Sequence, residues 1–315
     1  MQRRKAITIL LAVLSIVLVS TILCANSPDR TNALVSLTTN GAPENIVLNW
    51  KGDPSTSQAV TWRTDDSVQE GFAEIGLADA APTFIHNAQR SVAVTESLQT
   101  ENGVKYYHSF NFENLTANTL YAYRVGKDEH WSEWFHFRTA AIGDDPFSFI
   151  YFGDAQNNVL SLWSRAIRSA YSEAPKAKFM IHAGDLINRA NSDTEWREWF
   201  DAGDWIHAMV PGIPTPGNHE YKKSITGKTI SRFWRPQFTL PENGLAGLEE
   251  SVYYLDYQNI RIISLNSNER QEEQIPWLEK VLENNMQRWT VLTYHHPMYS
   301  SGKGRDNNPP KGKGK

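Results

Sequence analysis

The feature that most constrains this chain is a set of acidic and amide residues placed directly after apolar runs. The runs 147–152, 178–183 and 210–215 are followed by Gly153-Asp154, Gly184-Asp185 and Gly217-Asn218-His219. Short apolar runs of this kind predict buried strands, and the Gly after each run allows a sharp turn. Because ligands gather at the carboxyl ends of the strands in an open α/β sheet, we expect these polar side chains to meet at one edge.

A fourth apolar run, 288–294, ends in His295-His296 and supplies imidazoles. Carboxylate oxygens suit hard cations and imidazole suits zinc or iron, so the mixed donor set indicates transition metals. Two cations about 3.5 to 4 Å apart can clamp a phosphoryl group and generate hydroxide from bound water. Since such a pair needs a shared anionic oxygen, the pattern predicts a two-metal hydrolase with one bridging carboxylate.

Each of these residues is assigned an expected role. Asp185 is expected to bridge the metals, Asp154 to bind the first metal, and Asn218 and His295 to bind the second. His219 is the expected catalytic proton donor or oxyanion stabiliser and contacts the substrate. His296 either contacts the substrate phosphate or only packs.

The alternative to a metal site is a purely structural role for these residues. An isolated Gly-Asp often caps a helix, and a lone His is often structural. Spacings of 31 (154 to 185), 33 (185 to 218) and 77 (218 to 295) residues in a fixed order favour the metal site. His182 lies within a predicted strand and is expected to be structural. Five further histidines are assigned to surfaces or to the N-terminal region: His86, His108, His130, His136 and His207.

These motifs resemble the metallophosphoesterase (calcineurin-like phosphoesterase) superfamily, in which GD, GD, GNH with Glu or Asp, and His occur in this order. They are most similar to those of the purple acid phosphatases, over Asn45 to about Asp306. The resemblance implies an acid phosphatase-like enzyme that hydrolyses phosphate monoesters through two metal ions, with diesters left open as further substrates. Iron, zinc and manganese are all compatible with the donors.

One position near the first metal departs from the purple acid phosphatase pattern. The family has a Tyr ligand three residues after the bridging Asp, where this chain has Asn188. The protein is therefore not expected to be purple, and a divalent first metal is expected. Gln156 stands where other branches carry a His ligand. It either supplies a carbonyl oxygen or hydrogen-bonds a bound water.

The last family block, Gly-His-x-His, does not occur, and no His follows His296. In the family this block supplies one ligand to each metal. Residues 302–315 hold no large apolar side chain and are expected to form a disordered Lys and Gly tail. The chain is therefore interpreted as C-terminally truncated. A second hypothesis is a catalytically impaired remnant, because losing a ligand should cost more than the roughly 10 to 100-fold of a lost outer partner.

Residues 44–140 contain short alternating segments separated by turn residues, which predict a β-sandwich. The expected strands are 46–48, 59–62, 72–75, 106–112, 121–125 and 134–137. This region resembles the fibronectin type III-like N-terminal domain of purple acid phosphatases, in particular from Asn45 to Thr64. A non-enzymatic surface-binding module is the third hypothesis, and nothing positive supports it.

Residues 146–301 change to alternating strands and helices, which predicts an α/β domain of the αββα type, incomplete at its C-terminus. Expected helices are 158–172, 194–209 and 274–282, the last with Pro276 in its first turn, and residues 251–266 are expected to form two strands. The Trp-rich segment 195–205 is expected to be core.

The N-terminus carries Arg3, Arg4 and Lys5 before an apolar run from Ala6 to Leu23. This pattern predicts a signal peptide or membrane anchor over residues 1–25, followed by a linker at 26–43. The expected location is extracytoplasmic: secreted, periplasmic or anchored by residues 6–24. Lipidation of Cys24 stays open, and a single Cys excludes an internal disulfide.

The net charge of −4 gives no reason to expect nucleic acid as a partner. A small phosphorylated substrate is the expected partner. Membrane contact is expected only through the N-terminal segment, and the oligomeric state is left undetermined.

Overall fold

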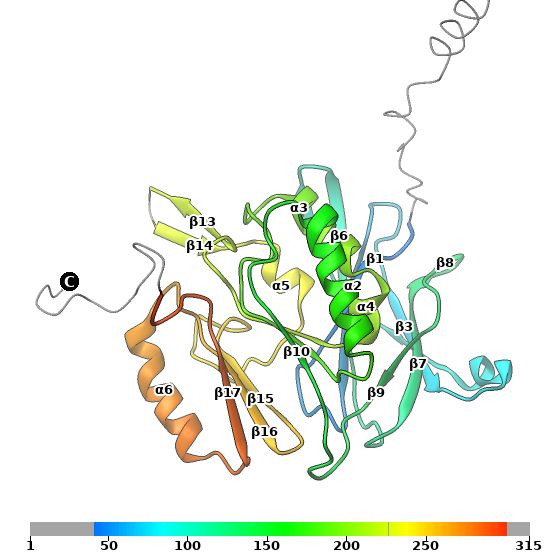
Figure 1. Cartoon of the computed structure of the whole chain (residues 1–315). Coiled ribbons are helices and arrows are strands. Elements are labelled where there is room, and N and C mark those ends of the chain that lie inside the picture. The colour runs from blue at the N-terminus through cyan, green and yellow to red at the C-terminus, as the bar shows by residue number, and fades with distance from the viewer. Residues whose placement is uncertain (1–40, 226, 301–315) are drawn as a thin grey trace, which may run out of the picture. The chain divides into compact units, whose positions relative to one another are not determined.

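The computed structural model describes residues 41–225 and 227–300 (Figure 1). The expected signal peptide or anchor, Cys24, most of the linker and the Lys and Gly tail lie outside these residues. In the described part of the chain, no helix has both the length and the apolar character required to cross a bilayer.

The N-terminal part is a sandwich of two antiparallel sheets, so the predicted sandwich is confirmed. The first sheet has the order β1 (Glu44–Asn49), β2 (Gln58–Thr64), β6 (Gly103–Phe112) and β5 (Val94–Thr100). The second has the order β4 (Gln89–Val92), β3 (Phe72–Leu77), β7 (Leu120–Lys127) and β8 (His130–Trp131), and β9 (Phe135–Arg138) pairs with β7. Aromatic and β-branched side chains from both sheets fill the space between them, among them Val60, Trp62, Tyr123 and Phe137.

Three strands and a 3-10 helix of this domain were missed from the sequence. The strands β4 and β5 lie at sheet edges and expose most of their side chains. Edge strands need not alternate between apolar and polar residues, so their sequences carry little period-two signal. The helix Pro82–Asn87 and the two-residue β8 are too short for any periodicity.

Strand β2 shows how the sandwich joins the rest of the chain, because all seven of its residues are buried. Alternate side chains cannot all face the sandwich core, so the outer face of β2 must be covered by later residues. Thr61 bonds the hydroxyl of Thr239 at 3.0 Å, and Arg63 pairs with Asp193. Next to it, Asn49 of β1 donates to the carbonyl of Gly212 at 2.8 Å.

The α/β domain begins with the parallel sheet β10 (Ile150–Phe152), β11 (Met180–His182) and β12 (Gly212–Pro214). The first crossover is a π-helical turn, Val159–Trp163, that continues into α2 (Ser164–Glu173). The second is α3 (Asp193–Gly203) and α4 (Trp205–Met209), drawn in green in Figure 1. The sequence predicted one helix here, but the chain breaks at Asp204, whose φ is 48°.

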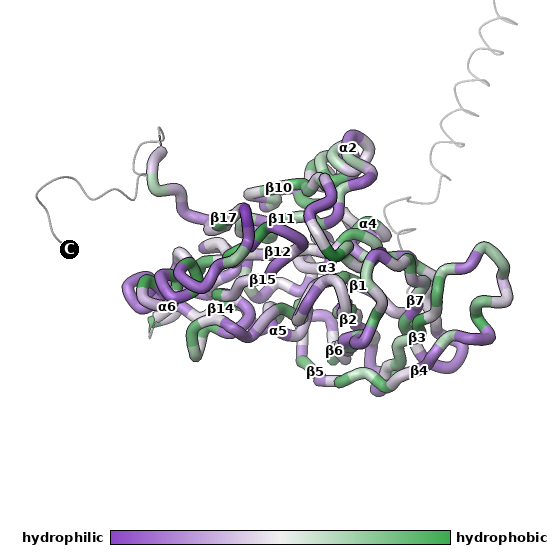
Figure 2. Tube along the Cα trace, turned by 90° about the horizontal axis from the view of Figure 1, so that it is seen from below, coloured by the Kyte–Doolittle hydropathy of each residue, from purple (hydrophilic) through white to green (hydrophobic). Residues whose placement is uncertain are grey.

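A second sheet contains β15 (Tyr253–Tyr257), β16 (Ile260–Ser264) and β17 (Trp289–Thr293). Strand β17 runs parallel to β16, and α6 (Gln271–Glu283) connects them and lies beside this sheet (Figure 1). In Figure 2 the trace of α6 is mostly hydrophilic, and only Gln274 and Val281 of α6 are buried. The predicted position of Pro276 is wrong, because α6 begins at Gln271 and places Pro276 in its second turn.

The fold class is confirmed as a β-sandwich followed by an α/β domain. Two short elements of the second domain were not predicted, the hairpin β13 (Tyr221–Ser224) and β14 (Gly227–Ile230), and the helix α5 (Trp234–Gln237). The hairpin is polar and largely exposed, so it lacks the apolar alternation by which strands are recognised.

The Trp-rich helix lies in the core, as expected. Trp196 and Trp199 of α3 are buried and pack edge-on against Phe238. The assignment of His207 to a surface or to the sandwich is wrong, because this residue lies in α4 and its ring stacks on Trp199 at 4.3 Å. His182 is buried in β11, where its sequence position placed it.

Candidate metal centre

The site is formed by the loops that follow β10, β11, β12 and β17. Asp154 and Asp185 each follow a strand and a Gly, and both adopt left-handed backbone conformations with φ of 51° and 54°. Asp tolerates this conformation better than most residues, and such strained positions cluster at functional sites. The first two loops are joined by backbone hydrogen bonds from Asp154 to the carbonyl of Gly184 (3.1 Å) and from Gln156 to that of Asp185 (2.9 Å).

The glycines allow the loops to approach one another. Gly184 has φ of 87°, and a Cβ there would lie 2.6 Å from the amide nitrogen of Gly217. A Cβ on Gly217 would lie 2.2 Å from Oδ1 of Asp185. No Cβ fits at these distances, so both loops require Gly for the contact itself and not only for the turn.

The acidic and imidazole groups converge at this place. Asp154, Asp185 and His295 each offer one ligand atom, and the three atoms lie within 4.8 Å of one another. Within residues 41–225 and 227–300 this is the one group of three or more His, Cys, Asp and Glu residues so arranged. The Nε2 atom of His295 lies 3.2 Å from Oδ2 of Asp185 and 3.2 Å from Oδ1 of Asn218. The structure thus brings all four expected ligands together, and their binding of metal stays a prediction.

The orientation of these donors fits a cation. The Nδ1–H of His295 donates to the carbonyl of Ala183 at 2.9 Å, which directs Nε2 toward the carboxylates. Gln156 donates to Oδ2 of Asp185 at 3.0 Å, while its own Oε1 is buried and has no hydrogen-bond partner. A buried oxygen that lacks a hydrogen-bond partner and lies next to these carboxylates is a suitable ligand atom for a cation.

The charges of the ligands are coupled. Burial alone would lower the pKa of His295, but its hydrogen bond to Asp185 and the charge of that residue raise the pKa to about 9. Burial would raise the pKa of Asp185, but hydrogen bonds from His295 and from the His219 amide hold that pKa below its usual value. The carboxylate of Asp185 is therefore ionised and available to a cation.

His219 lies beside this cluster and is partly exposed. Its backbone amide donates to Oδ1 of Asp185 at 2.9 Å, and its Nδ1–H donates to the carbonyl of Asn188 at 2.6 Å. The Nε2 atom is then the free nitrogen, 3.9 Å from Oδ2 of Asp185. Asn188 therefore contacts His219 through its main chain, at the position where the purple acid phosphatase pattern has a Tyr ligand.

Glu220 is a site residue that the sequence analysis missed. Its buried carboxylate accepts hydrogen bonds from the amides of Gly217 (2.7 Å), Asp185 (2.8 Å), Leu186 (2.7 Å) and Ile187 (3.4 Å). Burial and the nearby charge of Asp185 raise the pKa of Glu220 to about 7, against the opposing effect of these amides. Glu220 holds the β11 and β12 loops together. Its only signal in the sequence is its place directly after Asn218-His219.

His296 is held next to the cluster by Ser267. Its Nδ1 lies 2.9 Å from the Ser267 hydroxyl, and its backbone amide donates to the same oxygen at 3.1 Å. Burial and the charge of His295 lower the pKa of His296. One side of the ring borders a cavity of about 550 Å³ that Lys228 and Gln271 also line.

Two known protein families match the chain. Residues 43–139 match the purple acid phosphatase N-terminal domain, and residues 147–312 match the calcineurin-like phosphoesterase family. Residues 140–146, between the sandwich and β10, separate the two matches.

Curated relatives are distant. An uncharacterised protein of Mycobacterium tuberculosis (strain H37Rv) is 25% identical over 307 residues, which cover 85% of this chain and 57% of the relative. The human serine/threonine-protein phosphatase CPPED1 is 28% identical over 139 residues, or 39% of this chain and 43% of that protein. The chain spans about half the length of the curated relatives it matches.

Solved structures share the fold. A purple acid phosphatase from yellow lupin (Lupinus luteus) seeds superposes with a TM-score of 0.69 at 20% identity, covering 88% of this chain and 56% of that chain. The structure of PhoD superposes with a TM-score of 0.55 at 14% identity, covering 82% and 63%. At these identities the likeness concerns the arrangement of the chain alone.

Proposed function

Because this chain belongs to the calcineurin-like phosphoesterase family and carries the N-terminal domain of purple acid phosphatases, we propose that it hydrolyses phosphate monoesters at a two-metal centre. The observation that carries the proposal is the convergence of Asp154, Asp185 and His295 within 4.8 Å. Asn218 reaches the same point through its contact with His295. Four separate loops deliver these donors, and a purely structural cluster has no need of such an arrangement.

Each ligand has a proposed place. Asp154 and Asp185 would hold one cation, and Asp185, Asn218 and His295 the other, with Asp185 shared. Iron, zinc and manganese all suit this donor set. When bound, the two ions would supply positive charge at the phosphoryl oxygens and a water activated for attack on phosphorus.

The chain itself would supply proton transfer and substrate orientation. Because the Asn188 carbonyl accepts the Nδ1–H of His219, Nε2 is the atom that faces the reacting group. In its protonated form this nitrogen can donate to the leaving-group oxygen as the P–O bond breaks. The Ser267 hydroxyl holds the His296 ring, and this ring would contact a phosphoryl oxygen of the substrate.

The proposal is tested by metal content and by hydrolysis of a chromogenic phosphate monoester. We expect the purified protein to retain metal and to release phosphate, and Asp185→Asn to lose both properties. The matched control is Asp144→Asn, an exposed Asp outside the site, which should change neither. Retention of both properties in Asp185→Asn would contradict the bridging role. A wild-type protein that binds no metal and hydrolyses no ester would overturn the proposal and support the catalytically impaired alternative.

We also propose that the protein acts outside the cytoplasm on a small phosphorylated molecule. The support is the cationic start and apolar run of residues 1–25. Fractionation of cells that express the full chain, compared with a chain lacking residues 1–25, tests the location. Recovery of the full chain in the cytoplasmic fraction would contradict it.

A further inference from the structure

We propose that Glu195 and Glu101 are positioning residues for His219, so that the β5–β6 turn of the sandwich helps to orient the catalytic imidazole. The inference rests on the proposed function, in which His219 transfers a proton. It assigns to the N-terminal domain a part in catalysis, through a continuous series of hydrogen bonds.

The first step of this series is the peptide group between Asn188 and Arg189. Its carbonyl accepts from Nδ1 of His219 at 2.6 Å, and its N–H, on Arg189, donates to Oε2 of Glu195 at 2.6 Å. In a trans peptide the C=O and N–H are coplanar and point in opposite directions. Glu195 therefore holds one side of a rigid plane whose other side holds His219.

Additional bonds make Glu195 a firm anchor for this plane. The same carboxylate accepts from the amide of Asn188 at 2.9 Å and from Nε of Arg189 at 2.6 Å. The side chain of Glu195 is only 15% exposed, although its contacts with Arg189 lie at the protein surface. Without the carboxylate, two amides lose their acceptor and the 188–189 peptide is free to rotate.

The second step leads from Glu195 to the sandwich. Glu195 lies in the first turn of α3, where Ser192 is the N-cap and accepts from the Glu195 amide at 3.4 Å. The Ser192 hydroxyl donates to Glu101 at 3.2 Å, and the amide of Thr194 donates to the same oxygen at 3.1 Å. Glu101 belongs to the turn between β5 and β6, so the sandwich sets where this helix begins.

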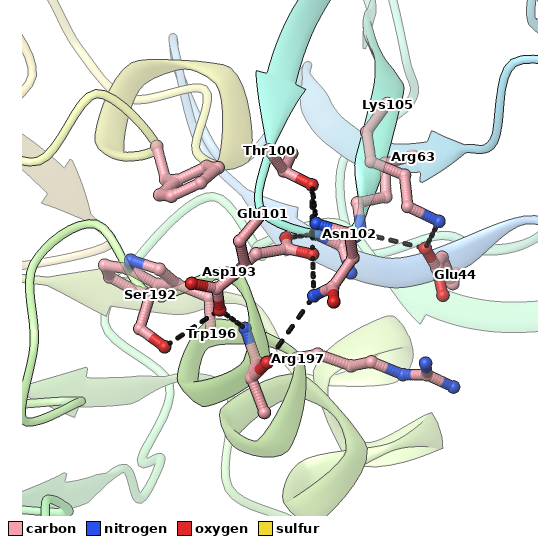
Figure 3. A network of polar contacts seen from close by, with 12 residues as sticks. Glu44, Arg63, Thr100, Glu101, Asn102, Lys105, Ser192, Asp193, Trp196 and Arg197 are labelled. Atoms are coloured by element: carbon pink, nitrogen blue, oxygen red, sulfur yellow. Dashed lines mark hydrogen bonds and ion pairs between the residues drawn. The ribbon is translucent and has the colours of Figure 1, made fainter.

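A buried ion pair also fixes the N-terminus of α3. Asp193 pairs with Arg63 of β2, and Asn102 of the turn donates to Asp193 at 2.9 Å (Figure 3). Glu44 accepts from Nε of Arg63 at 3.0 Å and from Lys105 at 3.0 Å. The start of α3 is thus held by side chains from two sandwich segments, β2 and the β5–β6 turn, so a small displacement of the sandwich would also displace Glu195.

The consequence for His219 is a defined tautomer and ring direction. Because the Asn188 carbonyl accepts the Nδ1 proton of His219, the Nε2 atom faces Asp185 and the other expected metal ligands. If the peptide rotates, the carbonyl leaves Nδ1, and the ring can place either nitrogen toward the substrate. Misplacement of a reacting group by about 1 Å can cost about 100-fold in rate.

The test is a double-mutant cycle between Glu195→Ala and His219→Ala. Both amides bond the same oxygen of Glu195, so the substitution must remove that oxygen. We expect Glu195→Ala to lower kcat for a chromogenic phosphate monoester about tenfold with little change in KM, less than the roughly 10² to 10⁴-fold effect of a lost general acid. In the His219→Ala background the same change should have no further effect, since the two residues act as one unit. Glu198→Ala, on the same helix, is the matched control and should leave kcat unchanged.

A second variant guards against a folding defect at Glu195. Glu101 is exposed, and Glu101→Ala removes the oxygen that accepts from Ser192 and Thr194 while it leaves Glu195 itself in place. We expect a smaller loss of kcat, about two to fivefold, which again disappears in the His219→Ala background. Thermal unfolding of each variant separates a positioning effect from a general loss of structure.

A spectroscopic readout tests the same inference without turnover. The ¹⁵N spectrum of the neutral His219 imidazole in metal-free protein should show the proton on Nδ1, and Glu195→Ala should populate the Nε2–H form. An unchanged tautomer, or an equal loss of kcat with and without His219, would overturn the inference. Because the spectrum requires no activity, a wild-type protein that hydrolyses nothing would overturn the proposed function alone.

Discussion

Two buried carboxylates, those of Glu220 and Asp193, each hold one region of this protein together, and they do so in different ways. Glu220 binds the loops of the metal centre and accepts only backbone amides, next to the charge of Asp185. Asp193 binds the domain junction and is paired with the buried Arg63. Burial and Asp185 raise the pKa of Glu220 to about 7, whereas Arg63 and Asn102 outweigh burial and lower the pKa of Asp193.

The difference shows how geometry and charge are divided between these regions. A carboxylate that binds amides from two loops fixes main-chain positions, and here its burial and the neighbouring charge of Asp185 raise its pKa. A carboxylate that pairs with a guanidinium compensates its charge and joins two domains. The metal centre is thus ordered by backbone contacts, and the junction by side-chain contacts.

The largest effect is expected from Glu220→Ala. Four backbone amides lose their acceptor, and each buried unpaired group costs about 1 to 3 kcal/mol. We expect the free energy of unfolding to fall by about 5 kcal/mol and metal to be lost. Urea denaturation and metal analysis measure these effects. A loss of only about 1 kcal/mol would show that the loops are held by other contacts.

Arg63→Met should come next. Removing one partner of a buried ion pair typically costs about 3 to 5 kcal/mol, because the other charge stays buried. At denaturant concentrations where the variant is still folded, its metal content should equal that of the wild type. The control is Arg63→Met combined with Asp193→Leu, which should recover most of the stability. Loss of metal in the folded single variant would contradict the separation of the two regions.

His207 provides a buried polar side chain with neither kind of compensation, since both ring nitrogens lack hydrogen-bond partners. Burial lowers its pKa from 6.5 to about 4. The unfolded state takes up the proton first, so stability is fully present above pH 6.5 and falls as the pH drops toward 4. The expected loss is about 3 kcal/mol.

The difference in unfolding free energy between the wild type and His207→Phe, measured between pH 7 and pH 4, tests this expectation. The wild-type curve alone does not, because the raised pKa of Glu220 changes stability in the opposite direction over this range. His182 contributes in the same direction as His207, because burial and His207 lower its pKa as well. A difference between the two proteins that stays constant over this range would contradict the neutral state of His207.

The smallest effect is expected at an exposed pair. Lys127 and Glu70 lie 3.0 Å apart on the sandwich surface, far from both carboxylates in sequence. Solvent-exposed pairs contribute at most about 1 kcal/mol, so Lys127→Ala should change unfolding by less than this and leave metal content unchanged. A larger loss would mean that charge pairing matters beyond the buried junction.

The succession of strands and helices along the chain and the loop residues of the candidate site could be predicted from the sequence, because both depend on neighbours along the chain. An apolar run followed by Gly and Asp predicts a buried strand and a polar turn, as at Asp154 and Asp185. The edge strand β5 and the hairpin β13–β14 were missed because exposed strands carry no apolar alternation. The break at Asp204 was missed because the apolar spacing continues through it.

The sequence by itself determined the succession of a sandwich and an α/β region and the polar residues presented at the ends of the strands, since hydrophobic period and turn chemistry are local properties. Only the tertiary structure decided which groups hold those ligands. Glu220 accepts from amides 33 to 35 residues away, and Glu101 meets α3 across more than 90 residues. Such pairings depend on how loops approach in space, and no local pattern encodes the partner of a carboxylate.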